Sequence, residues 1–251
     1  MHRFYLPPSQ TKSSSITLSD SEAHHLLHVL RGKEGDRVTV FDGCGQELTC
    51  AVAKAEKSRV TLKVLQRTAT APLPYQITLA QAVPKARNMD LILQKATELG
   101  VHGIVPLLSA RTVVQLEADD IATKLERWQQ IVIEAAKQCG ANWLPKVESP
   151  QKPAEFFHSA SRAQLNLIGS LQPDSRQLPN ILDDYREEHG SRPKQGTIVI
   201  GPEGDFTPAE LADARSAGFR PLTLGPLVLR SETAAIYALS ILAYELQQPA
   251  S

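Results

Sequence analysis

The chain has 251 residues, of which 42% are hydrophobic and 22% are charged, and its 27 Lys and Arg residues balance 27 Asp and Glu residues. This composition is typical of an ordinary globular protein, and the length suits one large domain or two unequal ones. No apolar run reaches the roughly 18 residues of a transmembrane helix, and the N-terminus lacks the apolar core of a signal peptide. Three cysteines without Cys-x-x-Cys spacing favour a reducing cytoplasm over a disulfide framework or a zinc site.

The charges are distributed unevenly along the chain. Residues 1–72 carry ten Lys and Arg against seven Asp and Glu, and the remainder carries a small acidic excess. A neutral chain cannot attract nucleic acid through its overall field, so such binding would depend on local basic patches. The basic excess is weak support for an N-terminal module that faces RNA.

The N-terminal part is predicted to be mainly β. Short β-prone runs with partial alternation lie at residues 3–6, 15–18, 36–41, 47–53 and 59–65. One helix is expected over residues 20–31, ended by Gly32. Because short strands follow one another this closely, the pattern predicts a small barrel.

The segment Thr68–Pro74 is the expected linker, because it contains two prolines and one large side chain. We therefore predict two domains, residues 1–72 and residues 73–251.

From Tyr75 onward, predicted strands and helices alternate. The strands are expected at residues 77–83, 104–107, 163–168, 198–200 and 222–224. The helices are expected at residues 88–99, 120–139, 178–188, 207–217 and 231–246. This alternation predicts an α/β domain with a largely parallel sheet.

Two glycine loops near the C-terminus form the candidate site. Gly201-Pro-Glu-Gly204 follows one predicted strand and Leu224-Gly225 follows the next, and each loop leads into a helix. The first of these helices begins with a predicted capping box, Thr207-Pro-Ala-Glu210. Ligands of open α/β sheets bind outside the carboxyl ends of the strands, where both loops lie. Neither loop matches a known phosphate-binding pattern, and glycine turns of this kind are most often structural.

The segments Ile-Gly-Pro-Glu-Gly, Leu-Gly and Leu-Arg-Ser-Glu-Thr-Ala together resemble the knotted methyltransferases of the SPOUT superfamily. More narrowly, they resemble the ribosomal RNA small subunit methyltransferase E family. Two further segments are similar to that family: residues 84–100, with Lys95-Ala-Thr-Glu-Leu-Gly100, and residues 134–139, Glu-Ala-Ala-Lys-Gln-Cys. The resemblance covers nearly the whole chain, with its motifs in the family's order.

This resemblance implies a fold and an activity. The fold would be a C-terminal SPOUT-like α/β domain with a parallel sheet and a trefoil knot, preceded by a PUA-like β-barrel that contacts RNA. The activity would be S-adenosylmethionine-dependent methylation of uridine N3 in 16S rRNA by a homodimer. Alternatives are an RNA-binding protein of this fold without catalysis, and a SPOUT methyltransferase with another RNA target.

The resemblance also implies which residues hold the cofactor, mostly through their backbone. They are Ile200, Gly201, Gly204, Leu224, Gly225, Leu229, Ser231, Thr233 and Ala234.

Catalysis at uracil N3 would need charge stabilisation and a proton acceptor. Arg230 is the first candidate to stabilise negative charge on the uracil oxygens, and Arg87 is the second. Glu232 could accept the proton, although an acid in a first helical turn is also favoured by the helix dipole. No metal is expected, because His24 and His28 lack a His-Glu-x-x-His pattern and an obvious third ligand.

RNA contact is expected from basic residues in two places. Arg31, Lys33 and Arg37 cluster around the end of the N-terminal helix, and Lys85 and Arg87 lie in the loop after a strand. Such residues can contact phosphates, or they can simply form a solvated surface.

Two positions depart from the family pattern. Ala141 stands where an arginine is expected, which removes one possible RNA contact. Asp205 stands where a second glycine usually follows Gly-Pro-Glu-Gly, which could alter the shape of the loop.

Overall fold

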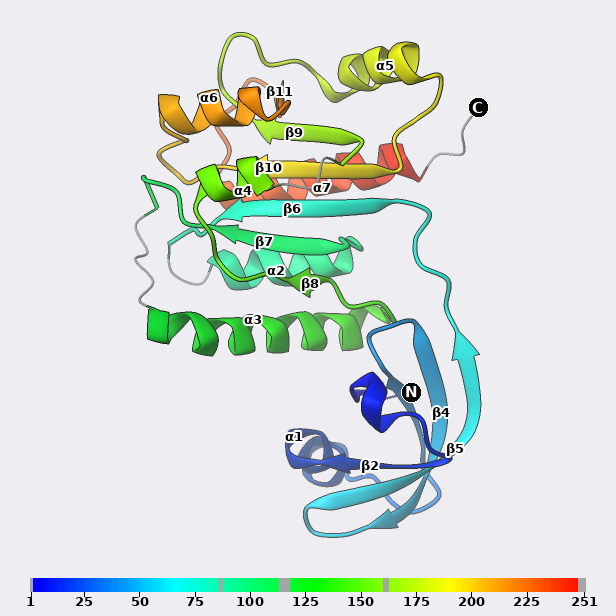
Figure 1. Cartoon of the computed structure of the whole chain (residues 1–251). Coiled ribbons are helices and arrows are strands. Elements are labelled where there is room, and N and C mark those ends of the chain that lie inside the picture. Colours follow the sequence, from blue (N-terminus) through cyan, green and yellow to red (C-terminus); the bar gives the residue numbers. More distant parts are fainter. Residues whose placement is uncertain (1, 86–87, 113–117, 160–162, 248–251) are drawn as a thin grey trace. The chain divides into compact units, whose positions relative to one another are not determined.

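The computed structural model describes residues 2–85, 88–112, 118–159 and 163–247 of the chain (Figure 1). The chain divides into two compact units. The first contains residues 1–72 and 133–144, and the second contains residues 73–132 and 145–251.

A five-stranded mixed sheet builds the first unit, in the order β1-β3-β4-β5-β2. Its strands are β1 (Arg3–Tyr5), β2 (Ser15–Ser19), β3 (Arg37–Phe41), β4 (Gln46–Ala55) and β5 (Arg59–Ala69). β1 runs parallel to β3, and the other neighbours are antiparallel. The β4–β5 register shifts after Thr49 and after Val52, and such bulges bend a strand. The sheet curls into a half-barrel (Figure 1), whereas the short predicted strands indicated a small barrel.

The concave side of this sheet carries the apolar core of the first unit. Leu48, Cys50 and Val52 alternate inward along β4 and meet Val60 and Leu62 of β5. Burial raises the pKa of the Cys50 thiol to about 11, so this side chain stays protonated and packs as a small apolar group.

The predicted N-terminal helix is shorter than expected. α1 (Asp20–His24) continues into a π-helical turn, η2 (His25–Val29), and a short 3₁₀ turn, η1 (Pro8–Gln10), precedes β2. Arg31 lies beyond the helical turns in a left-handed conformation, with φ of 55°. Gly32 then passes close to the helix: its N–H donates to the Leu26 carbonyl at 2.9 Å, and a Cβ there would lie 2.5 Å from Leu26 Cδ1.

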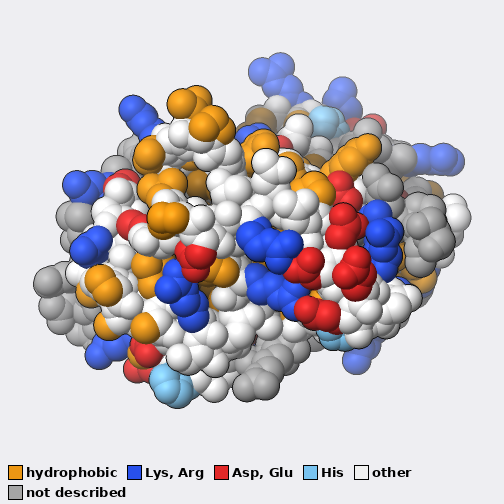
Figure 2. Space-filling view, turned by 90° about the horizontal axis from the view of Figure 1, so that it is seen from above, with side chains coloured by type: hydrophobic (Ala, Val, Ile, Leu, Met, Phe, Trp, Pro, Cys, Tyr) orange, Lys and Arg blue, Asp and Glu red, His pale blue; other side chains and the backbone are white. Residues whose placement is uncertain are grey.

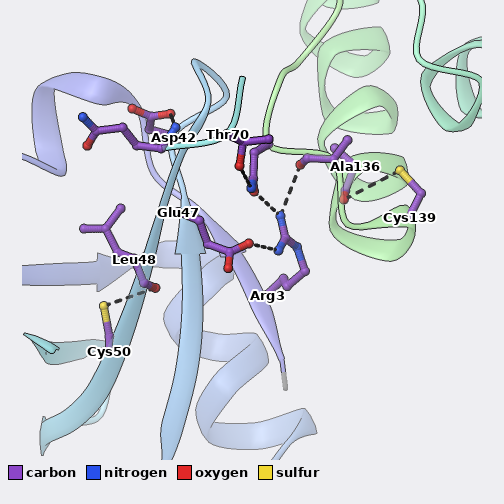
Figure 3. A network of polar contacts seen from close by, with 11 residues as sticks. Arg3, Asp42, Glu47, Leu48, Cys50, Thr70, Ala136 and Cys139 are labelled. Carbon is purple, nitrogen blue, oxygen red and sulfur yellow. Dashed lines mark hydrogen bonds and ion pairs between the residues drawn. The ribbon is translucent and has the colours of Figure 1, made fainter. Parts of the chain in front are cut away.

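Residues 133–144 join the first unit through a polar network around Arg3 (Figure 3). Arg3 Nη1 donates to Glu47 at 2.6 Å, and Nη2 donates to Asn142 Oδ1 at 2.6 Å and to the Ala141 carbonyl at 3.2 Å. The Asn142 amide donates in turn to Thr70 Oγ1 at 2.8 Å. The segment around Ala141 therefore helps to hold this unit together. Ala141, which stands where the family pattern has arginine, takes part through its backbone carbonyl.

The expected linker begins as a strand. β5 continues to Ala69, because Thr68 pairs with Glu47 and Ala69 pairs with Gln46 in β4. The prediction that the linker starts at Thr68 is therefore wrong by two residues. The composition of this segment suggests a loop, but pairing with β4 makes Thr68 and Ala69 part of a strand.

The second unit is built on a six-stranded parallel sheet in the order β11-β9-β10-β6-β7-β8. Its strands are β6 (Gln76–Ala82), β7 (Gly103–Leu107), β8 (Lys146–Val147), β9 (Leu165–Gly169), β10 (Gln195–Ile200) and β11 (Arg220–Leu222). Its helices are α2 (Asn88–Glu98), α3 (Ala118–Cys139, whose last turns belong to the first unit), α4 (Pro153–Ser159), α5 (Leu178–His189), α6 (Pro208–Ser216) and α7 (Ser231–Leu246). The prediction of an α/β domain with a parallel sheet is confirmed.

Helices cover both faces of this sheet (Figure 1). Phe156 and Phe157 of α4 pack with Ala214 of α6 against inward residues of the central strands, in one apolar cluster. α2 and α7 contact each other, and α7 contacts β6 and β10. This arrangement leaves the carboxyl ends of β10, β11 and β6 to the loops that carry the motifs.

Three features of the second unit differ from the prediction. β11 spans Arg220–Leu222 and not residues 222–224, because Thr223 already begins a turn in which its hydroxyl accepts from the Gly225 N–H at 3.3 Å. β8 and α4 were not predicted. β8 has two residues, and α4 has seven, which is too short for a clear helical period.

No helix in the described part of the chain is long and apolar enough to cross a membrane.

Candidate functional site

A cleft lies at the carboxyl ends of β9, β10 and β11, where the two glycine loops meet. It encloses about 650 Å³ together with its open mouth. Its lining comes from three loops and the first turn of α7: Gly169, Ser170, Leu171, Ile200, Gly201, Pro202, Glu203, Asp205, Leu224, Gly225, Leu227, Val228, Leu229, Ser231 and Ala234. The two glycine loops were predicted to form a ligand site at the ends of the strands, and the structure has a cleft at this position.

The first loop is held in shape by the capping box of α6. The Thr207 hydroxyl accepts from the Glu210 N–H at 3.2 Å, and the Glu210 carboxylate accepts from the Thr207 N–H at 2.8 Å. Asp205 adopts a left-handed conformation with φ of 60°, which Asp tolerates better than most residues. Its carboxylate accepts from the Phe206 N–H at 2.8 Å. Asp205 thus keeps a conformation natural to glycine, and it closes the turn with its own side chain.

Three other segments brace this loop. Ser231 Oγ donates to the Gly201 carbonyl at 2.9 Å, and Arg111 Nη1 donates to the Gly204 carbonyl at 2.6 Å. The carboxylate of Glu203 accepts from the backbone N–H of Lys85 at 3.3 Å. The loop is therefore fixed by α7, by the loop after β7 and by the loop after β6.

The second loop forms an apolar wall. Gly225 has φ of 111°, a conformation that side chains rarely adopt, and no atom lies within 4 Å of a Cβ added there. Leu227 and Val228 are 73% and 79% exposed at the mouth of the cleft. Exposed apolar side chains next to a cleft mark a surface that can cover a ligand.

The structure gathers most, but not all, of the predicted cofactor residues around this cleft. Seven of them line it: Ile200, Gly201, Leu224, Gly225, Leu229, Ser231 and Ala234. Gly204 and Thr233 do not. Gly204 instead contacts Arg111, and Thr233 faces solvent on α7.

The catalytic candidates lie at the start of α7. Arg230 is the N-cap residue of this helix, is exposed, and has no side-chain partner among the described residues. Glu232 Oε2 accepts from Asn88 Nδ2 at 3.2 Å, which ties α7 to the start of α2. Arg87 lies outside the described residues.

The three basic residues of the first unit that were predicted to contact RNA are open to solvent. Arg31, Lys33 and Arg37 are exposed, and within the described ranges none has a side-chain ion pair. Lys85, in the second unit, is also exposed, although its backbone binds Glu203.

On the side of the second unit that carries α5 and α6, three arginines of the described chain are in ion pairs, unlike Arg31, Lys33 and Arg37. Figure 2 shows Lys and Arg side chains lying next to Asp and Glu side chains on this face. Its ion pairs join Arg176 to Asp184, Arg215 to Asp174 and Arg220 to Glu188. Because the charges in these pairs neutralise each other locally, these three arginines are less suited to binding phosphate than unpaired ones.

Sequence reasoning missed two side chains of the site. Gln81 is fully buried on β6 and donates to Ser231 Oγ at 2.9 Å, and Arg111 braces Gly204. An amide between two alanines in a run that is apolar except for Thr78, Ile77–Val83, was a usable signal for Gln81. Arg111 had none, because its partner is a backbone carbonyl 93 residues away.

Known proteins resemble this chain over nearly its full length. A family model described as an RNA methyltransferase domain matches residues 71–243, and one described as an RNA methyltransferase PUA domain matches residues 18–65. The ribosomal RNA small subunit methyltransferase E of Bacillus subtilis is 30% identical, with 98% of this chain and 97% of the relative covered. The corresponding protein of Synechocystis is 33% identical, with 95% and 76% covered.

Two solved structures share the fold and considerable identity. A methyltransferase of Legionella pneumophila, solved with S-adenosylmethionine, has a TM-score of 0.88 and 33% identity, and 97% of each chain is covered. A ribosomal RNA small subunit methyltransferase E of Neisseria gonorrhoeae bound to S-adenosylmethionine has a TM-score of 0.85 and 34% identity, and 98% of each chain is covered. The second unit is thus the SPOUT-like domain, and the first is the PUA-like half-barrel, that the motifs predicted. The chain belongs to the ribosomal RNA small subunit methyltransferase E family of RNA methyltransferases.

Proposed function

We propose that this protein transfers a methyl group from S-adenosylmethionine to N3 of a uridine in 16S rRNA. The target would be the decoding-region uridine, position 1498 in standard rRNA numbering. The observation that carries the proposal is the cleft at the strand ends. Both glycine loops of the family line it, and Arg230, next to it in the chain, has no side-chain partner among the described residues.

The residues present suit this cofactor. Leu224, Leu227 and Leu229 offer apolar surface for an adenine ring, and the loop backbone can supply hydrogen bonds. Gly225 leaves open space where any larger residue would place a side chain. We place the cofactor against Ile200, Gly201, Leu224, Gly225, Leu229, Ser231 and Ala234, with Gly204 and Thr233 at its periphery.

S-adenosylmethionine supplies an electrophilic methyl group on a positively charged sulfur. As the N3 proton leaves, negative charge develops on the uracil oxygens that flank N3. The bond from N3 to the methyl carbon then forms as the C–S bond breaks, which leaves a neutral methylated uracil and a neutral thioether. Arg230 can donate hydrogen bonds to one of these oxygens, and it stays charged at any working pH.

Glu232 is the candidate proton acceptor. Asn88 holds its Oε2, and its Oε1 has no partner in the described part of the chain, so one oxygen is available for the proton. Arg87 is the alternative to Arg230 as a partner of the uracil oxygens.

The remaining partners follow from the surface. We propose that residues 1–72 bind rRNA through Arg31, Lys33 and Arg37, with Lys85 and Arg87 contributing from residues 73–251, the methyltransferase domain. Tyr237 and Tyr244, 46% and 65% exposed and two turns apart on α7, offer a face for a homodimer. Three free cysteines suit a cytoplasmic protein that acts on ribosomal subunits.

Calorimetry on matched variants tests the cofactor site. The wild-type protein should bind S-adenosylmethionine, and a chelator should leave the affinity unchanged. Gly225→Ala should weaken binding, because its Cβ enters the cleft. Gly190→Ala is the control: Gly190 also has a positive φ and open space, but it ends α5 away from the cleft. Equal losses of affinity in both variants, or no binding by the wild type, would contradict the proposal.

A further inference from the structure

Gln81 is a buried polar residue in an apolar strand. Its neighbours Ala80 and Ala82 point into the apolar cluster beneath α4 and α6, so Gln81 points to the opposite face, where α7 packs. It has no exposed surface, and it pairs in register with Ile200, the residue before Gly201. Burying an amide costs free energy unless its groups are hydrogen-bonded, so the hydrogen bonds of Gln81 must explain why a polar residue is buried here.

The two donor bonds of Gln81 lead to the cleft. Its Nε2 donates to the Ala82 carbonyl at 2.8 Å and to Ser231 Oγ at 2.9 Å. Ser231, which is 5% exposed and lines the cleft, donates to the Gly201 carbonyl at 2.9 Å. The relay Gln81–Ser231–Gly201 therefore joins the end of β6, the first turn of α7 and the first glycine loop.

The direction of this relay is fixed by chemistry. A serine hydroxyl has one proton to donate, and its lone pairs can accept. Because Gln81 donates to the hydroxyl oxygen, the hydroxyl proton is left for the Gly201 carbonyl. An acceptor at position 81 would attract that proton instead and release the loop.

We propose that Gln81 is a positioning residue for the cofactor. Acting through Ser231, it holds the Gly201 wall of the cleft in the orientation that binds S-adenosylmethionine. This inference rests on the proposed function, and it adds a residue that does not itself line the cleft.

One detail separates this role from a purely structural one. Gln81 Oε1 is buried and has no hydrogen-bond partner among the described residues. Replacing the amide by an apolar group of similar length removes this unsatisfied acceptor together with the two donated bonds. The stability of the fold should therefore change little, whereas the orientation of the loop should be lost.

The test compares Gln81→Met, Ser231→Ala, Ser231→Thr and the Gln81→Met/Ser231→Ala double variant. Cofactor affinity is measured by calorimetry and the unfolding midpoint by thermal denaturation. Each of the first two variants should weaken S-adenosylmethionine binding by about tenfold, the effect of one well-placed hydrogen bond. Threonine keeps the hydroxyl and should restore most of the affinity. The double variant should bind about as well as either single variant, because both break one relay.

Thr97→Val is the matched control. Thr97 is 2% exposed, and its hydroxyl donates to the Leu93 carbonyl within α2, so it is a buried polar group outside the relay. This variant should leave affinity unchanged. Normal affinity in Gln81→Met, or losses that add in the double variant, would overturn the relay.

If Gln81→Met does not fold, the alanine and threonine variants of Ser231 decide the question, and normal affinity in Ser231→Ala overturns it. Absence of binding by the wild type would instead refute the proposed function.

Discussion

Arg230 is the first candidate for stabilising charge on the uracil oxygens, and its position and lack of partners among the described residues are the arguments for this role. It caps α7 beside the second glycine loop, and its guanidinium has no partner in the described ranges of the chain. An arginine that stabilised the fold would have a carboxylate or carbonyl partner, as Arg111 does at Gly204. The lack of such a partner favours a contact with substrate.

Arg230→Ala should therefore lower the single-turnover rate by about 10²–10³, the usual cost of losing one preorganised donor. Affinities for cofactor and RNA should change little. Lysine should restore the rate only in part, because it lacks the planar fork of donors.

Rate, cofactor affinity and sedimentation are measured on one preparation. A near-normal saturated rate in Arg230→Ala would exclude the catalytic role, and lost affinity or dissociation would indicate a structural one.

Single residues also mark the limit of what the sequence could predict. The glycine loops and Ser231 were predicted through motifs, because they are continuous in the chain. Gln81 and Arg111 act across separations of 150 and 93 residues, so their roles appear only once the sheet brings the strand ends together. Asp205 departs from the family pattern, yet its left-handed conformation preserves the turn.

At the scale of elements, the capping box of α6 has two roles. It begins the helix, and its Glu210 also holds a loop next to the cleft. Glu210 is 9% exposed, and besides capping Thr207 it accepts from the Ala110 N–H at 2.9 Å. The same carboxylate therefore ties α6 to the loop that carries Arg111.

Glu210→Ala should destabilise the protein by about 1–3 kcal/mol, because it removes a cap and leaves the partly buried N–H groups of Thr207 and Ala110 without their carboxylate partner. The measurement is urea denaturation. Glu187→Ala on the exposed side of α5 is the control, and its effect should stay within about 0.5 kcal/mol. Equal effects of the two substitutions would show that Glu210 has no special role.

Elements with their own local signal were the predictable ones. The capping box of α6 was found where it was predicted, and the apolar run 198–200 marked the end of β10 but missed its first three residues. The last residues of β5 pair with the first residues of β4, and β8 pairs with β7, so both depend on a partner strand that the local sequence does not encode.

At the scale of the whole molecule, the net charge is zero, but several basic side chains of the two units differ in whether they are ion-paired. On the α5 and α6 face Arg176, Arg215 and Arg220 are in ion pairs, whereas Arg31, Lys33 and Arg37 in the first unit have no side-chain ion pairs among the described residues. RNA should therefore be attracted by the first unit.

Replacing Arg31, Lys33 and Arg37 together by Ala should weaken rRNA affinity and flatten its dependence on salt, because fewer counterions are released. Affinity for S-adenosylmethionine should not change. Binding is measured across a salt series, and replacing the paired Arg176, Arg215 and Arg220 serves as the control. An unchanged slope for the first set would mean that it is only a solvated surface.

The most direct test of the whole account is mass mapping of 16S rRNA from cells that lack this protein. One decoding-region uridine should lose its N3 methyl group. The wild-type protein should restore it, and Arg230→Ala should restore it poorly. Full methylation of every 16S uridine site in those cells would contradict the proposed function.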